Sequence, residues 1–129
     1  MPPLALVLAV GSLAMAMNAD LAGSAWRPSH LSSTDLPADN RIVMKFDGGQ
    51  LTGYGGCNRF FSAYSVSGET IRIGPLASTR KGCPATMDLE ASFFAALRAA
   101  KTFQHASDRL VLFDAKGGEL AQFVQVDDA

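Results

Sequence analysis

One helical pattern stands between two groups of short strand patterns, and this order constrains the fold more than any other feature of the chain. After Pro84, which suits a first helical turn, Leu89, Phe93 and Leu97 recur every four residues. The rest of the chain alternates apolar and polar residues in short runs, as half-buried strands do. We expect strands at residues 24–31, 42–47, 50–54, 60–66, 70–73, 102–106, 109–114 and 119–126.

Turn residues separate these strands. Asp47-Gly48-Gly49 can adopt the positive φ angles of a tight hairpin, and residues 115–118 form a second glycine turn. Residues 32–40 consist of turn-forming types throughout. Because such short connections make a sheet antiparallel, the single helix must cover one face of the sheet or plug one end. The sequence therefore predicts an α+β fold in which a curved, barrel-like antiparallel sheet packs on one α-helix.

The helix also has a polar side. Thr86 and Asp88 are of the types that cap a helix and occupy its first turn. Glu90 and Arg98 are expected to face away from the apolar stripe. We interpret that stripe as part of the core and not as a ligand groove.

Length and charge exclude one class of function. The chain has 129 residues, of which 48% are hydrophobic, and this is enough for one domain with its own core. Its formal net charge is -1. A nucleic-acid-binding protein would need a basic face against phosphate, so we expect no nucleic-acid partner.

The first nineteen residues differ in composition from the rest, because they contain no Asp, Glu, Lys or Arg. The apolar run at residues 4–17 is shorter than the roughly 20 residues of a membrane span. Ala14-Met15-Ala16 fits the small-x-small pattern of signal peptidase, so we expect a signal peptide at 1–19, cleaved after Ala16 or Ala19. The alternative is a buried first helix or strand of the domain.

The mature domain would then occupy residues 20–129. It opens with Leu21-Ala22-Gly23-Ser24, which resembles a bacterial lipoprotein box except that Ser24 replaces the acylated cysteine. We therefore expect no lipid anchor and no membrane span in the mature chain. These features predict a monomeric protein that is periplasmic or secreted.

The chain has two cysteines, Cys57 and Cys83. In an oxidising compartment a pair of this kind most simply forms a disulfide. Two buried free thiols are an alternative. A zinc site is a weaker one, because the cysteines stand 26 residues apart and the histidines are His30 and His105. Catalysis by Cys57 would require a base beside it.

The stretch Gly53-Tyr54-Gly55-Gly56-Cys57-Asn58-Arg59 is the most unusual segment of the chain. Read as a dinucleotide-binding fingerprint, it has Asn58 where the third glycine should be, and it leads into a strand instead of a helix. Neither a phosphate-binding loop nor a G-x-S-x-G element occurs. We therefore predict no catalytic, cofactor-binding or metal-binding residues.

Basic residues flank both cysteines. Arg59 follows Cys57, while Arg80 and Lys81 precede Cys83, so a disulfide would bring the three cations together. We name Asn58, Arg59, Arg80 and Lys81 as candidate partner-binding residues. Solvated charge on a turn is the alternative, in which Asn58 bonds only to nearby backbone.

These features in this order resemble the META domain family, also called HslJ-like. The resemblance covers residues 21–126. Its opening and glycine-cysteine elements are Leu21, Gly23, Trp26, Gly55, Gly56, Cys57, Asn58, Phe60 and Tyr64. Its later elements are Ile73, Gly74, Leu76, Thr79, Cys83, Glu90, Phe93, Phe94, Leu97, Leu110, Leu112 and the hairpin 117–123. One departure is the basic Arg80-Lys81 pair.

The resemblance implies a curved antiparallel sheet of somewhat lipocalin-like topology, an exported envelope protein and a link to stress or antibiotic tolerance. It brings no catalytic residues. Our first hypothesis is a non-enzymatic domain that binds a partner in the envelope. The alternative is a carrier of a small ligand inside the curved sheet. A third hypothesis is an enzyme that uses scattered carboxylates or a free Cys57.

Overall fold

The structure is a computed structural model that describes residues 20–127, and within them every strand belongs to one antiparallel sheet. The helix is α2 (Met87–Ala99). The strands before it are β1 (Ala25–Leu31), β2 (Thr34–Asp35), β3 (Val43–Asp47), β4 (Gln50–Tyr54), β5 (Arg59–Ser67), β6 (Thr70–Ile73) and β7 (Ala77–Ser78). Those after it are β8 (Thr102–Ala106), β9 (Arg109–Phe113) and β10 (Glu119–Val126).

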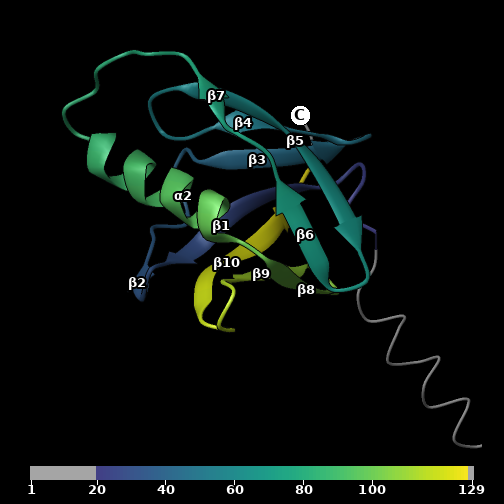
Figure 1. The fold of residues 1–129 in the computed structure, drawn as a ribbon. Coiled ribbons are helices and arrows are strands. Elements are labelled where there is room, and N and C mark those ends of the chain that lie inside the picture. Colours follow the sequence, from purple (N-terminus) through teal and green to yellow (C-terminus); the bar gives the residue numbers. More distant parts are fainter. Residues whose placement is uncertain (1–19, 128–129) are drawn as a thin grey trace, which may run out of the picture.

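The sheet closes into a barrel. Its strand order is β10-β9-β8-β6-β5-β4-β3-β1, and β10 also pairs with β1, from Ala25 opposite Val126 to Leu31 opposite Ala121 (Figure 1). The short strands β2 and β7 pair with β1 and β5. Closure removes the free edges of the main sheet, which would otherwise present unpaired backbone groups. The predicted barrel-like α+β fold is therefore confirmed.

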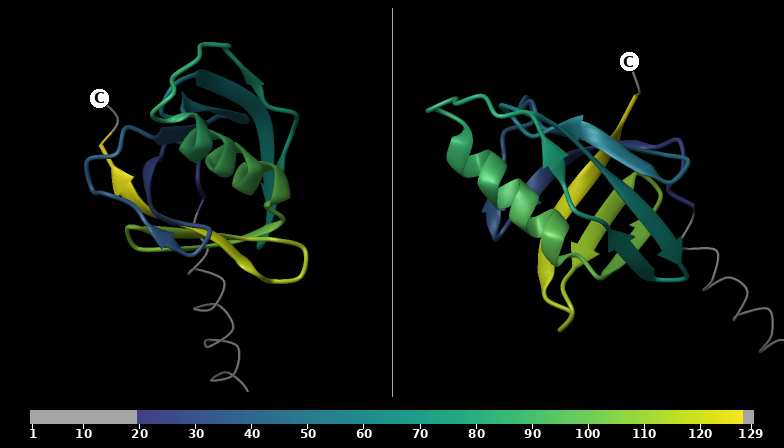
Figure 2. Two further views of the ribbon diagram at one scale, coloured as in Figure 1. Left: turned by 90° about the vertical axis from the view of Figure 1, so that its left-hand side faces the viewer. Right: turned by 45° about the horizontal axis from the view of Figure 1, so that its top comes forward.

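Helix α2 lies across one end of the barrel, as the end-on view shows (Figure 2, left). It contacts β1 and β10. Its buried side chains are Glu90, Phe93, Phe94, Ala96 and Leu97. Of the two expected placements, the helix therefore takes the end of the barrel.

Side chains on the inner faces of the strands fill the barrel. Alternate residues of each strand point inward, and the largest of them are fully buried. Phe60 packs edge-on against Phe93 of the helix, with ring centroids 5.6 Å apart, and Trp26 packs edge-on against His105 at 5.1 Å. The largest fully buried side chains are Trp26, Phe46, Phe60, Phe93, Phe103, Phe123, Leu21, Ile42, Met44, Leu51, Ile71 and Leu97.

Residues 21–26 fix the position of Trp26 in this core. Gly23 has a φ of 82° and donates its backbone N–H to the carbonyl oxygen of Phe46 at 2.7 Å. The Trp26 indole Nε1 donates to the Ser24 hydroxyl, which in turn donates to the carbonyl oxygen of Leu21. The buried indole N–H is therefore satisfied within five residues of chain.

Three local expectations need correction. The helix begins at Met87, three residues after Pro84, which lies in the preceding turn. Thr86 occupies the N-cap position, but its hydroxyl makes no capping bond. Residues 32–40 are not turn throughout, because Ser32 and Ser33 at φ 50° and 68° make a two-residue turn that pairs β2 with β1.

The described residues can be searched for a membrane span, but they do not include the predicted signal peptide. Among residues 20–127, we find no helix with the length and apolar character needed to cross a bilayer. The predicted signal peptide at residues 1–19 lies outside the described residues.

Candidate functional site

The glycine-rich segment is a sharp corner between β4 and β5. The Gly55 N–H donates to the carbonyl oxygen of Asn58 at 2.8 Å, and Gly56 has a φ of 108°, which favours glycine. Gly55 is required for a different reason. A Cβ atom there would lie 2.9 Å from both Glu90 and Phe94, so the helix approaches the corner too closely for a side chain.

A disulfide joins this corner to the segment before the helix. Cys57 and Cys83 are bonded, with their Cα atoms 5.8 Å apart. Cys57 is buried, and no cysteine is left free. The structure therefore contains the disulfide that the cysteine count predicts, and it gives no basis for a reactive thiol at Cys57.

Glu90 is the centre of a buried polar cluster at the corner. Its side chain is 4% exposed. One carboxylate oxygen accepts the backbone N–H groups of Cys57 at 3.0 Å and Asn58 at 2.5 Å, and the other accepts the Asn58 side-chain amide at 2.8 Å. A buried carboxylate is tolerated when hydrogen bonds replace its lost water, and three donors do so here.

Asn58 extends this cluster to the segment before Cys83. Its side-chain oxygen accepts the hydroxyl of Thr79 at 2.8 Å and the backbone N–H of Lys81 at 2.6 Å. Its side-chain nitrogen donates to the Lys81 carbonyl oxygen at 3.2 Å. We call the set Cys57, Asn58, Thr79, Lys81 and Glu90 the Glu90 network. It ties the helix, the corner and residues 79–83 together.

The Glu90 network corrects two expectations. Glu90 does not face away from the core, since it shares the buried stripe of Phe93 and Leu97. Its position three and seven residues before them is the sequence signal that would have placed it there. Asn58 is 4% exposed and its amide is occupied, so this candidate partner-binding residue cannot present its side chain to a partner.

The other three candidate residues lie on two segments whose backbones are paired. The Thr79 N–H donates to the Arg59 carbonyl oxygen at 3.0 Å, and the Arg59 N–H donates to the Thr79 hydroxyl at 3.2 Å. This pairing sets Arg59 beside the segment of Arg80 and Lys81, and all three are exposed. We call Arg59, Arg80 and Lys81 the basic edge.

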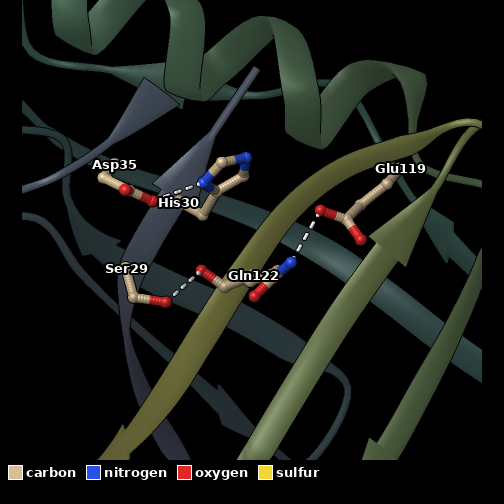
Figure 3. A network of polar contacts seen from close by, with 5 residues as sticks. All are labelled: Ser29, His30, Asp35, Glu119 and Gln122. Atoms are coloured by element: carbon tan, nitrogen blue, oxygen red, sulfur yellow. Dashed lines mark hydrogen bonds and ion pairs between the residues drawn. The ribbon is translucent and has the colours of Figure 1, made fainter. Parts of the chain in front are cut away.

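A second polar cluster lies near β1, β2 and β10 and was not predicted (Figure 3). His30 Nδ1 lies 2.8 Å from Asp35, and Gln122 donates to Glu119 at 2.8 Å. The Ser29 hydroxyl points to the carbonyl oxygen of Gln122, at 3.3 Å, and not to the His30 ring. A hydrolytic Ser–His–Asp arrangement needs the hydroxyl on the imidazole, which these residues do not provide.

His30 and Asp35 form a surface pair. The Asp35 side chain is 93% exposed, so solvent screens the pair and it contributes little to stability. Within residues 20–127, no group of three or more His, Cys, Asp or Glu side chains is placed to hold a metal ion.

Solved structures share the fold at low sequence identity. An NMR structure of a protein from Burkholderia xenovorans matches with a TM-score of 0.66 and 18% identity, over 84% of this chain and 85% of that chain. A second NMR structure matches with a TM-score of 0.64 and 19% identity, over 81% and 90%. A crystal structure of a DUF4847 family protein from Bacteroides vulgatus matches with a TM-score of 0.64 and 16% identity, over 84% and 96%.

At these identities the structural matches establish the fold alone. A comparison with curated proteins found no significant match. The sequence matches the profile of the META domain over residues 19–127, which include the corner, the disulfide and the Glu90 network. This match spans most of the chain, and the protein therefore belongs to the META domain family.

Proposed function

We propose that the protein is a non-enzymatic domain of the bacterial cell envelope that holds a partner on its outer surface and supports tolerance of stress. This proposal rests on one observation, that the most reactive groups at the corner are engaged in holding the fold together. Both cysteines form the disulfide, and the Glu90 carboxylate accepts three hydrogen bonds inside the fold. The groups that remain available at this corner are those of the exposed basic edge.

A binding role on the outside also agrees with the packing of the inside. Trp26, Phe60 and Phe93 lie within the barrel at 2% exposure or less, together with several leucines. A small-ligand carrier of this fold would keep that space open. The packed aromatic side chains therefore favour a surface site over a ligand held inside the sheet.

Export and cleavage are part of the proposal and have their own test. The full-length protein, expressed in a bacterial host, should be recovered from the periplasm or the medium. Mass spectrometry of the purified chain should give an N-terminus after Ala16 or Ala19. Recovery of the uncleaved chain from the cytoplasm would refute the envelope location.

The binding role is tested by exchanging charges on the basic edge. A strain lacking the gene should be more sensitive to heat or to envelope-directed antibiotics, and the wild-type gene should restore growth. An Arg59→Glu, Arg80→Glu variant should fail to restore it. A matched Arg72→Glu, Lys116→Glu variant, which reverses two exposed charges elsewhere, should succeed. A deletion strain with unchanged sensitivity would refute the stress role.

A further inference from the structure

Outward-facing side chains of β1, β3, β4 and β5 form two cross-strand rows on the barrel. The strand register sets the first row as Val126, Ala25, Lys45, Thr52 and Phe61. The second row includes Val43 opposite Tyr54 and Tyr54 opposite Arg59, with Arg27 next to Val43. We call these two rows the outer face. Phe61 is 61% exposed there, which is unusual for a large apolar side chain.

A hollow of about 320 Å³ opens in the outer face where β1, β3, β4 and the end of β10 meet. Ala25 and Gly53 line it with a methyl group and with backbone. Arg27, Val43, Lys45 and Thr52 are among the residues that line it. Asp127 lines it as well, so cations outnumber anions around the hollow by two to one.

Arg27, which lines this hollow, has an unused donor. Its Nε atom is buried and has no hydrogen-bond partner. Nearly all buried donors in proteins find an acceptor, so an orphaned guanidinium nitrogen requires an explanation. A carboxylate bound in the hollow would supply one, because Nε–H and one terminal N–H of arginine form a parallel pair that matches two carboxylate oxygens. The guanidinium would turn toward the hollow to make this contact.

The outer face has a second arginine, Arg59, at the far end of the same row as Arg27. Arg59 on β5 lies three strands away from Arg27 on β1, which is about 14 Å at the usual strand spacing. Between them lie Val43 and Tyr54, which are half-buried and largely apolar. The second row is therefore cationic at both ends and apolar in the middle.

We propose that the outer face binds an extended acidic segment of a partner protein that crosses the strands. An extended chain advances about 3.4 Å per residue, so carboxylates four residues apart are separated by about 14 Å. One carboxylate would meet Arg27 and the other Arg59, while an apolar side chain between them contacts Val43 and Tyr54. The separation of about 14 Å between Arg27 and Arg59 suits two carboxylates of one extended segment better than a single phosphate group, which could reach only one of the two arginines.

This inference states what kind of partner the proposed binding role involves. It rests on the proposed function only where it uses Arg59. Arg27 lies outside the basic edge. A result at Arg27 therefore tests the acidic segment separately from the proposed function, which depends on Arg59 and Arg80.

The test measures binding of a synthetic peptide by fluorescence anisotropy. The probe is a fluorescein-labelled peptide with the core Glu-Ala-Leu-Ala-Glu, and the matched control has Gln in place of both Glu residues. We expect the mature protein to bind the probe saturably below about 1 mM and to bind the control at least tenfold more weakly. Binding should weaken as salt is raised, because exposed charge pairs are screened.

Protein variants assign the site. Arg27→Gln and Arg59→Gln should each weaken probe binding about tenfold, and Arg72→Gln, an exposed arginine on β6, should leave it unchanged. Thermal unfolding followed by circular dichroism checks that each variant is folded. If Arg27→Gln does not fold, Arg59→Gln carries the test.

Several results would overturn the inference. These are the absence of saturable binding at about 1 mM, equal binding of the Gln control, or unchanged binding by folded Arg27→Gln and Arg59→Gln. Vesicles containing phosphatidylglycerol provide a further comparison. If these vesicles bind through Arg27 and Arg59 while the peptide does not, the outer face recognises anionic lipid and the acidic-segment proposal is wrong.

Discussion

Replacing Glu90 by Gln should lower the melting temperature of the domain by about 12 °C. The substitution changes one atom and keeps the size of the side chain. It matters because three donors point at the Glu90 carboxylate, two from backbone N–H groups and one from the side-chain amide of Asn58. A glutamine has one acceptor oxygen, so it cannot accept at both of the original oxygen positions.

The magnitude follows from these contacts. If the amide oxygen keeps the two backbone donors, each bond changes from charge-assisted to neutral, which costs about 1 kcal/mol apiece. The amide nitrogen then faces the Asn58 side-chain nitrogen, and this lost bond costs at least another 1 kcal/mol or so. Rotating Asn58 does not help, because its oxygen already accepts from Thr79 and Lys81. The sum is about 3 kcal/mol, at about 4 °C per kcal/mol for a domain of this size.

The assay is thermal unfolding of the oxidised protein, followed by circular dichroism. Glu69→Gln is the matched control, because Glu69 is exposed and undergoes the same chemical change. We expect this control to melt within about 2 °C of the wild type. If Glu90→Gln has the same melting temperature as Glu69→Gln, the buried hydrogen bonds do not contribute as argued and the reasoning is refuted.

Three further predictions concern the same fold. Replacing Cys57 and Cys83 together by Ser should destabilise the domain by about 3.5 kcal/mol in denaturant unfolding; an unchanged midpoint would contradict the disulfide. Gly55→Ala should lower the free energy of unfolding by about 2 kcal/mol, measured in denaturant, because its Cβ would overlap side chains of the helix. Gly82→Ala should leave this free energy unchanged, since a Cβ there meets no atom within 4 Å. Equal stability of the two variants would argue against the close approach at Gly55. Burial, the largest cause, raises the pKa of Tyr64, so stability should fall as pH rises through that pKa, since the unfolded chain loses its proton first. Tyr64→Phe should not show this alkaline loss, and identical pH profiles would contradict it.

Local sequence patterns were enough to predict most of the fold. Alternation along residues 42–47 and 50–54, with Gly48 and Gly49 at φ 59° and 91° between them, was enough to predict the β3–β4 hairpin. Strands β2 and β7 were missed because each has two residues, too few for an alternating pattern. Each of them forms beside a longer strand, β2 beside β1 and β7 beside β5.

The corner shows why the site was harder to predict. The sequence identified Cys57, Asn58 and Cys83, since residue types and local turns are visible there. It could not pair Asn58 with Glu90, because the two stand 32 residues apart and meet only after α2 caps the barrel. The periodicity of the helix held part of the answer, but a carboxylate on an apolar stripe is unusual without buried donors to receive it. Two of those three donors are backbone groups, which no side-chain pattern reveals.

The pairing of β1 with β10 has a consequence for how the chain reaches this structure. Ala25 and Val126 are opposite each other, so β1 cannot pair with β10 until the chain has been made as far as residue 126. Contacts of such long sequence separation slow folding, because the intervening loop must be closed first. A growing chain therefore cannot complete the barrel until its C-terminal strand β10 is available to pair. A truncation that removes β10 should leave residues 20–118 without a closed sheet, however complete the rest of the sequence.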